Sequence, residues 1–183
     1  MTALSRTLIS ATAGLVLIGL AGCSGGTAGG NGKTTTEQTP TSSSAGSGLK
    51  NFDTCAFFTQ EDLSVAGVEG PGEKAEQLSF EPGCSYTGEK ILLTLYKNEE
   101  ETVSKYESDG HWDKYEKFSI NGRNAARAVE GGGGAVDAGC SIVLDAGGGV
   151  VLVDVTEAKP DSVSDKCGEA EKIARQIEPR LPK

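Results

Sequence analysis

Five cysteines constrain the fold of this 183-residue chain more than any other feature. That number is high for a reduced cytosolic protein of this size and ordinary for an exported one. Cys23 stands apart because it directly follows an apolar run, whereas Cys55, Cys84, Cys140 and Cys167 are spread over the rest of the chain. If Cys23 has a separate role, the remaining four form an even set that can pair as disulfides.

Residues 1–22 have the layout of a secretory signal peptide. Arg6 is the only charged residue among them, and the apolar run over 8–20 is shorter than the roughly 20 residues that span a bilayer as a helix. The run ends in Leu20-Ala21-Gly22-Cys23, which resembles the bacterial lipobox. The resemblance implies that a signal peptidase recognises Leu20, Ala21 and Gly22 and cuts after Gly22. It also implies diacylglycerol on Cys23, often with an added N-terminal acyl group such as palmitate. The alternative is an ordinary cleaved signal with a chance cysteine.

The segment 23–48 is predicted to be a lipidated cysteine followed by a disordered linker. Ser, Thr and Gly make up 18 of the 25 residues after Cys23, and only Lys33 and Glu37 are charged. Such a composition cannot bury a core. As a flexible coil it would span roughly 25–30 Å, which is enough to hold a domain away from the membrane. The Thr and Ser clusters at 34–36 and 42–44 also permit O-linked glycosylation.

Residues 49–183 are expected to form a single α+β domain, with a mainly antiparallel sheet built from hairpins and with helices on its faces. Thr59 to Asp62 reads as a capping box that opens a short helix ending at Gly67. Hairpins are predicted for 83–96, around Asn121-Gly122, and for 140–156 with a turn at 147–149. The strands 91–96 and 150–155 are apolar at successive positions, which predicts that they are central and covered on both faces.

Two further helices are expected. Asn98 and the three glutamates after it predict a helix that starts there and runs to about Ser108. Near the C-terminus an apolar stripe predicts a long amphipathic helix packed on the sheet, capped by Asp161 or Ser162 and ended by Pro179 and Pro182. The members of the stripe are Val163, Cys167, Ala170, Ala174, Ile177 and Leu181.

The four cysteines of the domain allow three disulfide connectivities. We favour Cys140–Cys167, because Cys140 shares a strand face with Ile142 and Cys167 lies on the apolar stripe of the last helix. The other pair is then Cys55–Cys84. A zinc site is the alternative, but it requires closely spaced cysteine pairs or clustered histidines, and the sequence has neither.

Three motifs stand out in the domain, namely Cys55-Ala56-Phe57-Phe58-Thr59, Gly83-Cys84-Ser85-Tyr86 and Ile120-Asn121-Gly122-Arg123. They are joined by the order of the cysteines and by Cys167-Gly168, which is expected to open a helix that ends at Leu181-Pro182. In these features the domain resembles a family of actinobacterial lipoproteins of unknown function. The family implies an extracytoplasmic location and a two-disulfide scaffold, and it brings no activity. More loosely, the expected sheet with helices on its faces resembles PsbP-like envelope lipoproteins, which are thought to act by binding.

The sequence shows no catalytic constellation, metal site or cofactor motif. His111 is the only histidine, and it lies with Trp112 where we expect a helix to give way to a loop. We interpret the pair as surface and core-edge residues, with a ligand contact as the alternative. Gly131 to Gly134 lack the lysine and hydroxyl residue of a phosphate-binding loop. No pair of acidic residues stands out as a catalytic dyad.

A formal net charge of −9 argues against nucleic acid as a partner. We expect a lipid-anchored protein on the outer face of the cell membrane that acts as a non-enzymatic binding or interaction module for an unknown envelope ligand or protein. Two alternatives stay open. One is an envelope hydrolase with an acidic site, and the other is a structural subunit of an envelope complex.

Overall fold

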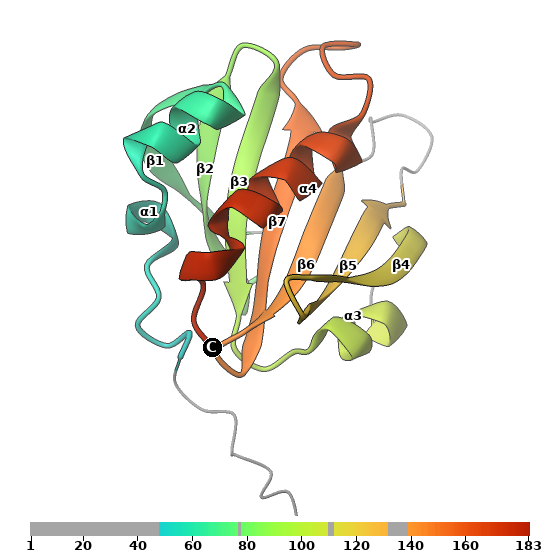
Figure 1. Ribbon diagram of the computed structural model, residues 1–183. Coiled ribbons are helices and arrows are strands. Elements are labelled where there is room, and N and C mark those ends of the chain that lie inside the picture. The colour runs from blue at the N-terminus through green and yellow to red at the C-terminus, as the bar shows by residue number, and fades with distance from the viewer. Residues whose placement is uncertain (1–47, 77, 110–111, 132–138) are drawn as a thin grey trace, which may run out of the picture. The chain divides into compact units, whose positions relative to one another are not determined.

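The computed structural model describes residues 48–76, 78–109, 112–131 and 139–183, which all belong to one compact unit spanning 40–183. They form a sheet of seven strands with helices on both faces (Figure 1). The bounds are α1 (Thr54–Phe57), α2 (Gln60–Ala66), β1 (Val68–Glu76), β2 (Pro82–Gly88), β3 (Ile91–Asn98), α3 (Val103–Asp109), β4 (Trp112–Ile120), β5 (Arg123–Glu130), β6 (Cys140–Ala146), β7 (Gly149–Glu157), α4 (Lys166–Ile177) and a final 3-10 turn, η1 (Glu178–Arg180).

The sheet is antiparallel throughout, in the order β1-β2-β3-β7-β6-β5-β4. It consists of two meanders, β1 to β3 and β4 to β7, which are joined where β3 pairs with β7. That pairing runs from Ile91 opposite Glu157 to Asn98 opposite Val150. The prediction that the two apolar strands are central is therefore confirmed, and the expected α+β class with a mainly antiparallel sheet roughly fits.

The main core lies between the sheet and the helices α1, α2 and α4. Alternate residues of the central strands, among them Leu93, Leu95 and Val153, are fully buried there. Ile173 and Ile177 of α4 pack against them, and Figure 1 shows α4 crossing this face diagonally. Because strand residues alternate between faces, the remaining residues of β3 and β7 point to the other side.

A smaller core covers part of the second face. Val103 and Tyr106 of α3 pack on Ala126, Val143 and Leu152 of the sheet. The helix begins later than the sequence analysis expected, because Asn98 is still paired in β3 and its side-chain oxygen accepts a hydrogen bond from the Glu100 backbone N–H. The three glutamates therefore precede the helix. Thr102 fills the capping role, accepting a bond from the Lys105 N–H at 3.2 Å.

Several turn and cap predictions are confirmed. Thr59 and Asp62 form a reciprocal capping box at the start of α2, and Gly67 ends that helix with a left-handed φ of 69°. Asn121 and Gly122 both have positive φ angles, 51° and 85°, as a two-residue type I′ hairpin turn requires. The C-terminal helix ends at Ile177, immediately before η1 with its Pro179.

Three local predictions need correction. The last helix begins at Lys166 with Asp165 as its N-cap, so neither Asp161 nor Ser162 caps it. Asp161 has a φ of 58°, which is not a helical N-cap geometry, and Val163 packs on the core from a loop. Trp112 starts strand β4 instead of a loop.

The edge strand β1 was missed altogether. Its sequence contains Gly70, Pro71 and Gly72, which argue against a strand, and its pairing with β2 is irregular between Glu69 and Glu73. Irregular pairing of this kind is typical of edge strands.

Candidate functional site

Two disulfides fasten the helices of the main face to the sheet, with the connectivity that the sequence favoured. Cys55 of α1 is bonded to Cys84 of β2, with 5.0 Å between their Cα atoms. Cys140 at the start of β6 is bonded to Cys167 in the first turn of α4, with a Cα separation of 5.1 Å. The predicted Cys140–Cys167 pair is confirmed, and the apolar stripe of α4 does face that side of the sheet.

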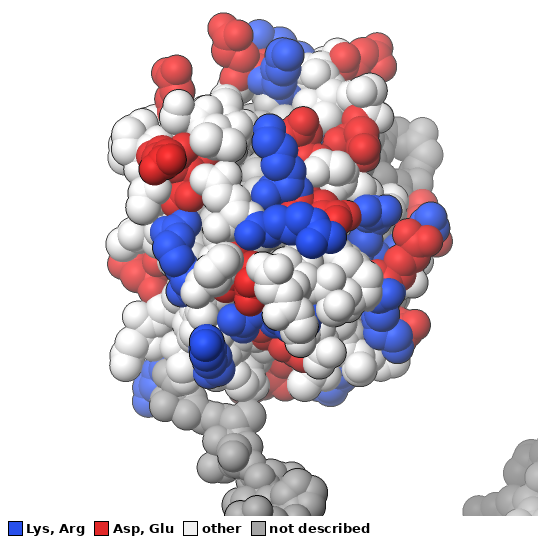
Figure 2. Space-filling view, viewed as in Figure 1, with Lys and Arg blue, Asp and Glu red and all other residues white. Residues whose placement is uncertain are grey.

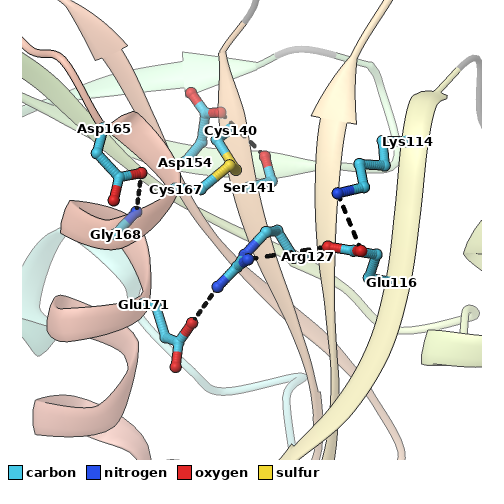
Figure 3. Close-up of a disulfide and its surroundings, with 10 residues drawn as sticks. All are labelled: Lys114, Glu116, Arg127, Cys140, Ser141, Asp154, Asp165, Cys167, Gly168 and Glu171. Carbon is cyan, nitrogen blue, oxygen red and sulfur yellow. Dashed lines mark hydrogen bonds and ion pairs between the residues drawn. A yellow bond between two sulfur atoms is a disulfide. The ribbon is translucent and has the colours of Figure 1, made fainter.

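The beginning of α4 is held by more than the disulfide (Figure 3). The Asp165 carboxylate accepts a hydrogen bond from the Gly168 N–H at 2.8 Å. A side chain at position 168 would collide with that carboxylate, because a Cβ would lie 2.3 Å from Oδ2 of Asp165. Further along, Arg127 of β5 binds Glu171 of α4 and lies 3.8 Å from Glu116 of β4. The disulfide and Arg127 thus fix α4 directly to β6 and β5.

A groove of about 810 Å³ lies beside this braced helix start. Four segments form it, namely α2, the start of β1, the turn between β2 and β3, and the loop that leads into α4, all at the upper end in Figure 1. Val68 and Ile91 belong to its lining and are almost fully buried. The volume lies within the range of small-molecule sites.

The groove is lined mainly by polar side chains. Gln60, Ser64 and Ser164 make no side-chain hydrogen bond to any other residue that the structure describes, so their donors and acceptors are available to a ligand. The charged residues of the lining are four carboxylates and one ammonium group: Glu69, Glu89, Asp165, Glu169 and Lys90. Figure 2 shows acidic side chains together with Lys or Arg at the upper end of this face, and Lys and Arg with some acidic neighbours across its middle, over α4. The lining therefore carries an excess of negative charge, part of which is offset by Lys172 at 3.6 Å from Glu169.

A second hollow, of about 390 Å³, lies at the other end of the sheet. Most of its polar side chains are already engaged within the chain. Arg123 donates from Nη1 to the carbonyl oxygens of Asp145 and Pro182, at 2.7 and 2.8 Å. The Asp145 carboxylate accepts bonds from the Val103 N–H and from Asn124. These contacts pin the C-terminal residues and leave few groups for a ligand.

Two carboxyl groups approach one another at the edge of the second face. A Cβ on Gly139 would lie 3.2 Å from Asp154 Oδ2 and 3.3 Å from Glu130 Oε2. Asp154 is only 8% exposed and accepts a hydrogen bond from Ser141 Oγ at 2.9 Å (Figure 3). Burial, with a contribution from the charge of Glu130, raises the pKa of Asp154 to about 7. This carboxyl is therefore about half protonated near neutral pH.

Some of the site residues predicted from the sequence lie outside the residues that the structure describes. They are Leu20, Ala21, Gly22, Cys23 and His111.

Trp112 is described and half-buried, and its Nε1–H donates to the Tyr106 carbonyl at 2.7 Å. Its ring stacks on Tyr106 and lies beside Tyr115, so Trp112 holds α3 against the sheet. A ligand contact by Trp112 remains a prediction.

Within the described ranges, no group of three or more His, Cys, Asp or Glu side chains could hold a metal ion. No helix among those residues has both the length and the apolar character needed to cross a bilayer.

A model of the family described as "Protein of unknown function (DUF3558)" matches residues 18–180. The chain belongs to this family. No curated protein and no solved structure matches the chain. Membership of the DUF3558 family confirms the expectation of a family without an assigned activity.

Sequence reasoning missed both the groove and the carboxyl pair of this DUF3558 protein. The groove could not be found in advance, because its four segments become neighbours only when β1 joins the sheet and α4 crosses it. The carboxyl pair did leave a signal. Asp154 interrupts an otherwise apolar run from Val150 to Val155 in the central strand, where a charged residue demands a partner or a shifted pKa.

Proposed function

We propose that this DUF3558 protein is a lipid-anchored, non-enzymatic binding protein on the outer face of the cell membrane. Its two disulfides indicate an oxidising, extracytoplasmic location. The lipobox-like Leu20-Ala21-Gly22-Cys23 supplies the anchor, and the Ser/Thr/Gly-rich segment after it supplies the tether. Two or more acyl chains on Cys23 give stable attachment, whereas one chain alone is marginal.

The binding site is the groove between α2 and the start of α4. The observation that carries this proposal is a hollow of about 810 Å³ with unpaired hydrogen-bonding side chains on a braced scaffold. Ligand sites on pre-formed scaffolds lose little conformational entropy on binding. Here the Cys140–Cys167 disulfide and the Asp165 cap fix one wall. The opposite wall, α2, is held by its capping box and by Asp62, which accepts bonds from Gln176 and Arg180.

The charge of the groove selects the class of ligand. Four carboxylates against one ammonium group favour a small polar molecule with a positive charge, such as an amine. Hydroxyl and amide groups of Ser64, Ser164 and Gln60 add neutral hydrogen-bond partners. The ligand is therefore expected to be hydrophilic and cationic.

Spermidine serves as a probe of this site. We expect calorimetric titration to show that the mature protein binds spermidine. The double variant Glu69→Gln, Glu169→Gln removes two charges from the groove and should bind spermidine more weakly. Loss of two nearby charges should weaken binding by about tenfold at low salt. Added salt should weaken binding to the parent protein, because partly exposed charges are screened.

The matched control is the double variant Glu99→Gln, Glu100→Gln. It makes the same change of net charge at the opposite end of β3, away from the groove. Binding equal to that of the parent protein is expected for this control. An equal loss in both double variants would show attraction by overall charge and would contradict a site in the groove.

An envelope hydrolase is the second candidate, and the approach of Asp154 and Glu130 is the observation that favours it. A partly protonated carboxyl beside another carboxyl is the arrangement that acid–base catalysis uses. Against it, Asp154 is 8% exposed and lines neither the groove nor the second hollow. Turnover of an envelope glycan that is abolished by Asp154→Asn would support this candidate over the binding protein.

A further inference from the structure

Three large apolar side chains are markedly exposed in the part of the chain that the structure describes. They are Val65 on α2, at 46% exposure, and Leu78 and Phe80, at 49% and 53%. The last two lie in the turn between β1 and β2, and Ser79 between them is also exposed. The single acidic residue of this turn, Glu81, is turned inward and only 4% exposed. Residues 78–80 of this turn thus present an uncharged and mainly apolar tip.

This apolar turn lies close to the point where the chain enters the domain. The Lys97 ammonium donates to the Leu49 carbonyl at 2.7 Å, which fixes the first described residues beside the end of β3. The next residue, Asn98, donates from Nδ2 to Glu81 Oε1 at 3.4 Å, and the Glu81 N–H donates to the Leu78 carbonyl at 2.8 Å. Neighbouring residues of β3 therefore contact both the entering chain and the apolar turn.

The groove lies at the other end of the same hairpin. β1 begins at Val68, opposite Gly88, and ends at Glu76, opposite Pro82. The groove is lined by residues from the first end, including Val68 and Glu89, whereas the apolar turn follows the second end. Nine residues of strand separate the two ends, which is about 30 Å at 3.3 Å per residue.

We propose that Leu78 and Phe80 insert into the interfacial region of the bilayer and set the orientation of the anchored domain, with the groove directed away from the membrane. This inference rests on the lipid anchor of the proposed function. A short Ser/Thr/Gly-rich tether of this composition would keep the turn at an effective concentration in the millimolar range at the surface, so that two apolar side chains suffice for transient docking. Burial of apolar side chains drives the contact. Charge does not contribute, because the three residues that follow β3, Glu99 to Glu101, are acidic.

The test places a tryptophan at the turn and compares it with one at the opposite end. Lipidated full-length mature protein carrying Phe80→Trp is reconstituted into phosphatidylcholine vesicles whose acyl chains bear bromine quenchers. Val65→Trp is the matched control, because it replaces an apolar side chain of similar exposure near the groove. Trp112 contributes the same background to both proteins. We expect the added emission of Phe80→Trp to be quenched about twofold more than that of Val65→Trp, with Leu78→Trp behaving like Phe80→Trp.

The outcomes separate the orientation from the anchor. If the proteins float with the vesicles but the tryptophans at 65 and 80 are quenched equally, the orientation is wrong and the anchor stands. If the lipobox-intact protein fails to float with vesicles at all, the anchor itself fails, and the orientation fails with it. A third outcome is a blue shift of the Phe80→Trp emission that occurs without lipid and depends on protein concentration. It would mean that the turn contacts a second copy of the protein, and it would also overturn the proposal.

Discussion

Asp154 shows how one residue can make stability depend on pH. It lies among apolar residues in the central strand β7. Its side chain is on the face opposite α4, with Ser141 and Glu130 near it. Burial raises its pKa from 3.8 to about 7. The folded state therefore holds a proton that the unfolded state loses between these two pH values. This contribution to stability is most favourable below pH 4 and declines as the pH rises to 7.

We therefore predict that Asp154→Asn stabilises the protein at alkaline pH relative to the parent. The amide resembles the protonated carboxyl and cannot ionise. The difference in unfolding free energy between variant and parent should grow by on the order of 4 kcal/mol from pH 4 to pH 8. Urea unfolding at both pH values measures it.

Comparison with the parent removes the effects of groups that titrate in both proteins. Glu171 and Glu178, for example, have pKa values lowered by hydrogen bonds from Arg175 and Arg123, so their contribution is lost as the pH falls. A variant-to-parent difference that stays constant from pH 4 to pH 8 would show that Asp154 is charged in the folded state throughout.

At the scale of elements, the two disulfides have similar loop lengths but different neighbours. Their sequence separations are 29 and 27 residues. Chain entropy alone assigns each about 3.5 kcal/mol. Only the Cys140–Cys167 bond, however, holds the start of α4, where Asp165 and Glu169 line the groove.

Removing each disulfide should therefore separate stability from binding. We predict that Cys55→Ser, Cys84→Ser and Cys140→Ser, Cys167→Ser double variants each lose about 3–4 kcal/mol of unfolding free energy. Spermidine binding should weaken only in the second variant, measured at a temperature where both are folded. Equal binding in the two variants would mean that the disulfide does not shape the groove.

Some helices and strands could be predicted from the sequence and others could not. The central strands and the C-terminal helix could be predicted, because Leu93, Val153 and Ile177 follow the periodicity of buried strands and of an amphipathic helix. Strand β1 could not be predicted, because its glycines and Pro71 argue against a strand. They are tolerated only because β1 lies at the edge of the sheet, which is evident only from its pairing with β2. The predicted start of α3 was wrong because Asn98 pairs with Val150 in the sheet and does not cap the helix.

At the scale of the whole molecule, the proposed membrane attachment would depend on one atom, the sulfur of Cys23. We predict that Cys23→Ser releases the protein from the membrane. The variant should leave the detergent phase in a phase-partition assay and appear in the medium, because no diacylglycerol can be attached through a thioether. Ser24→Ala is the control and should stay in the detergent phase. Retention of the Cys23→Ser protein would show that something other than this cysteine anchors it.

The position of β7 has a consequence for the order in which the protein can fold. This strand is the fourth of seven in the sheet and the last strand in the chain. Before β7 is present, β3 and β6 each expose an unpaired edge, and the two meanders share no hydrogen bond. A chain built this way completes its core only after its final third is available. Its folding therefore depends on distant contacts and is expected to be slow. A protein that crosses a membrane as an extended chain gains from that delay, because its core is not complete before the passage is finished.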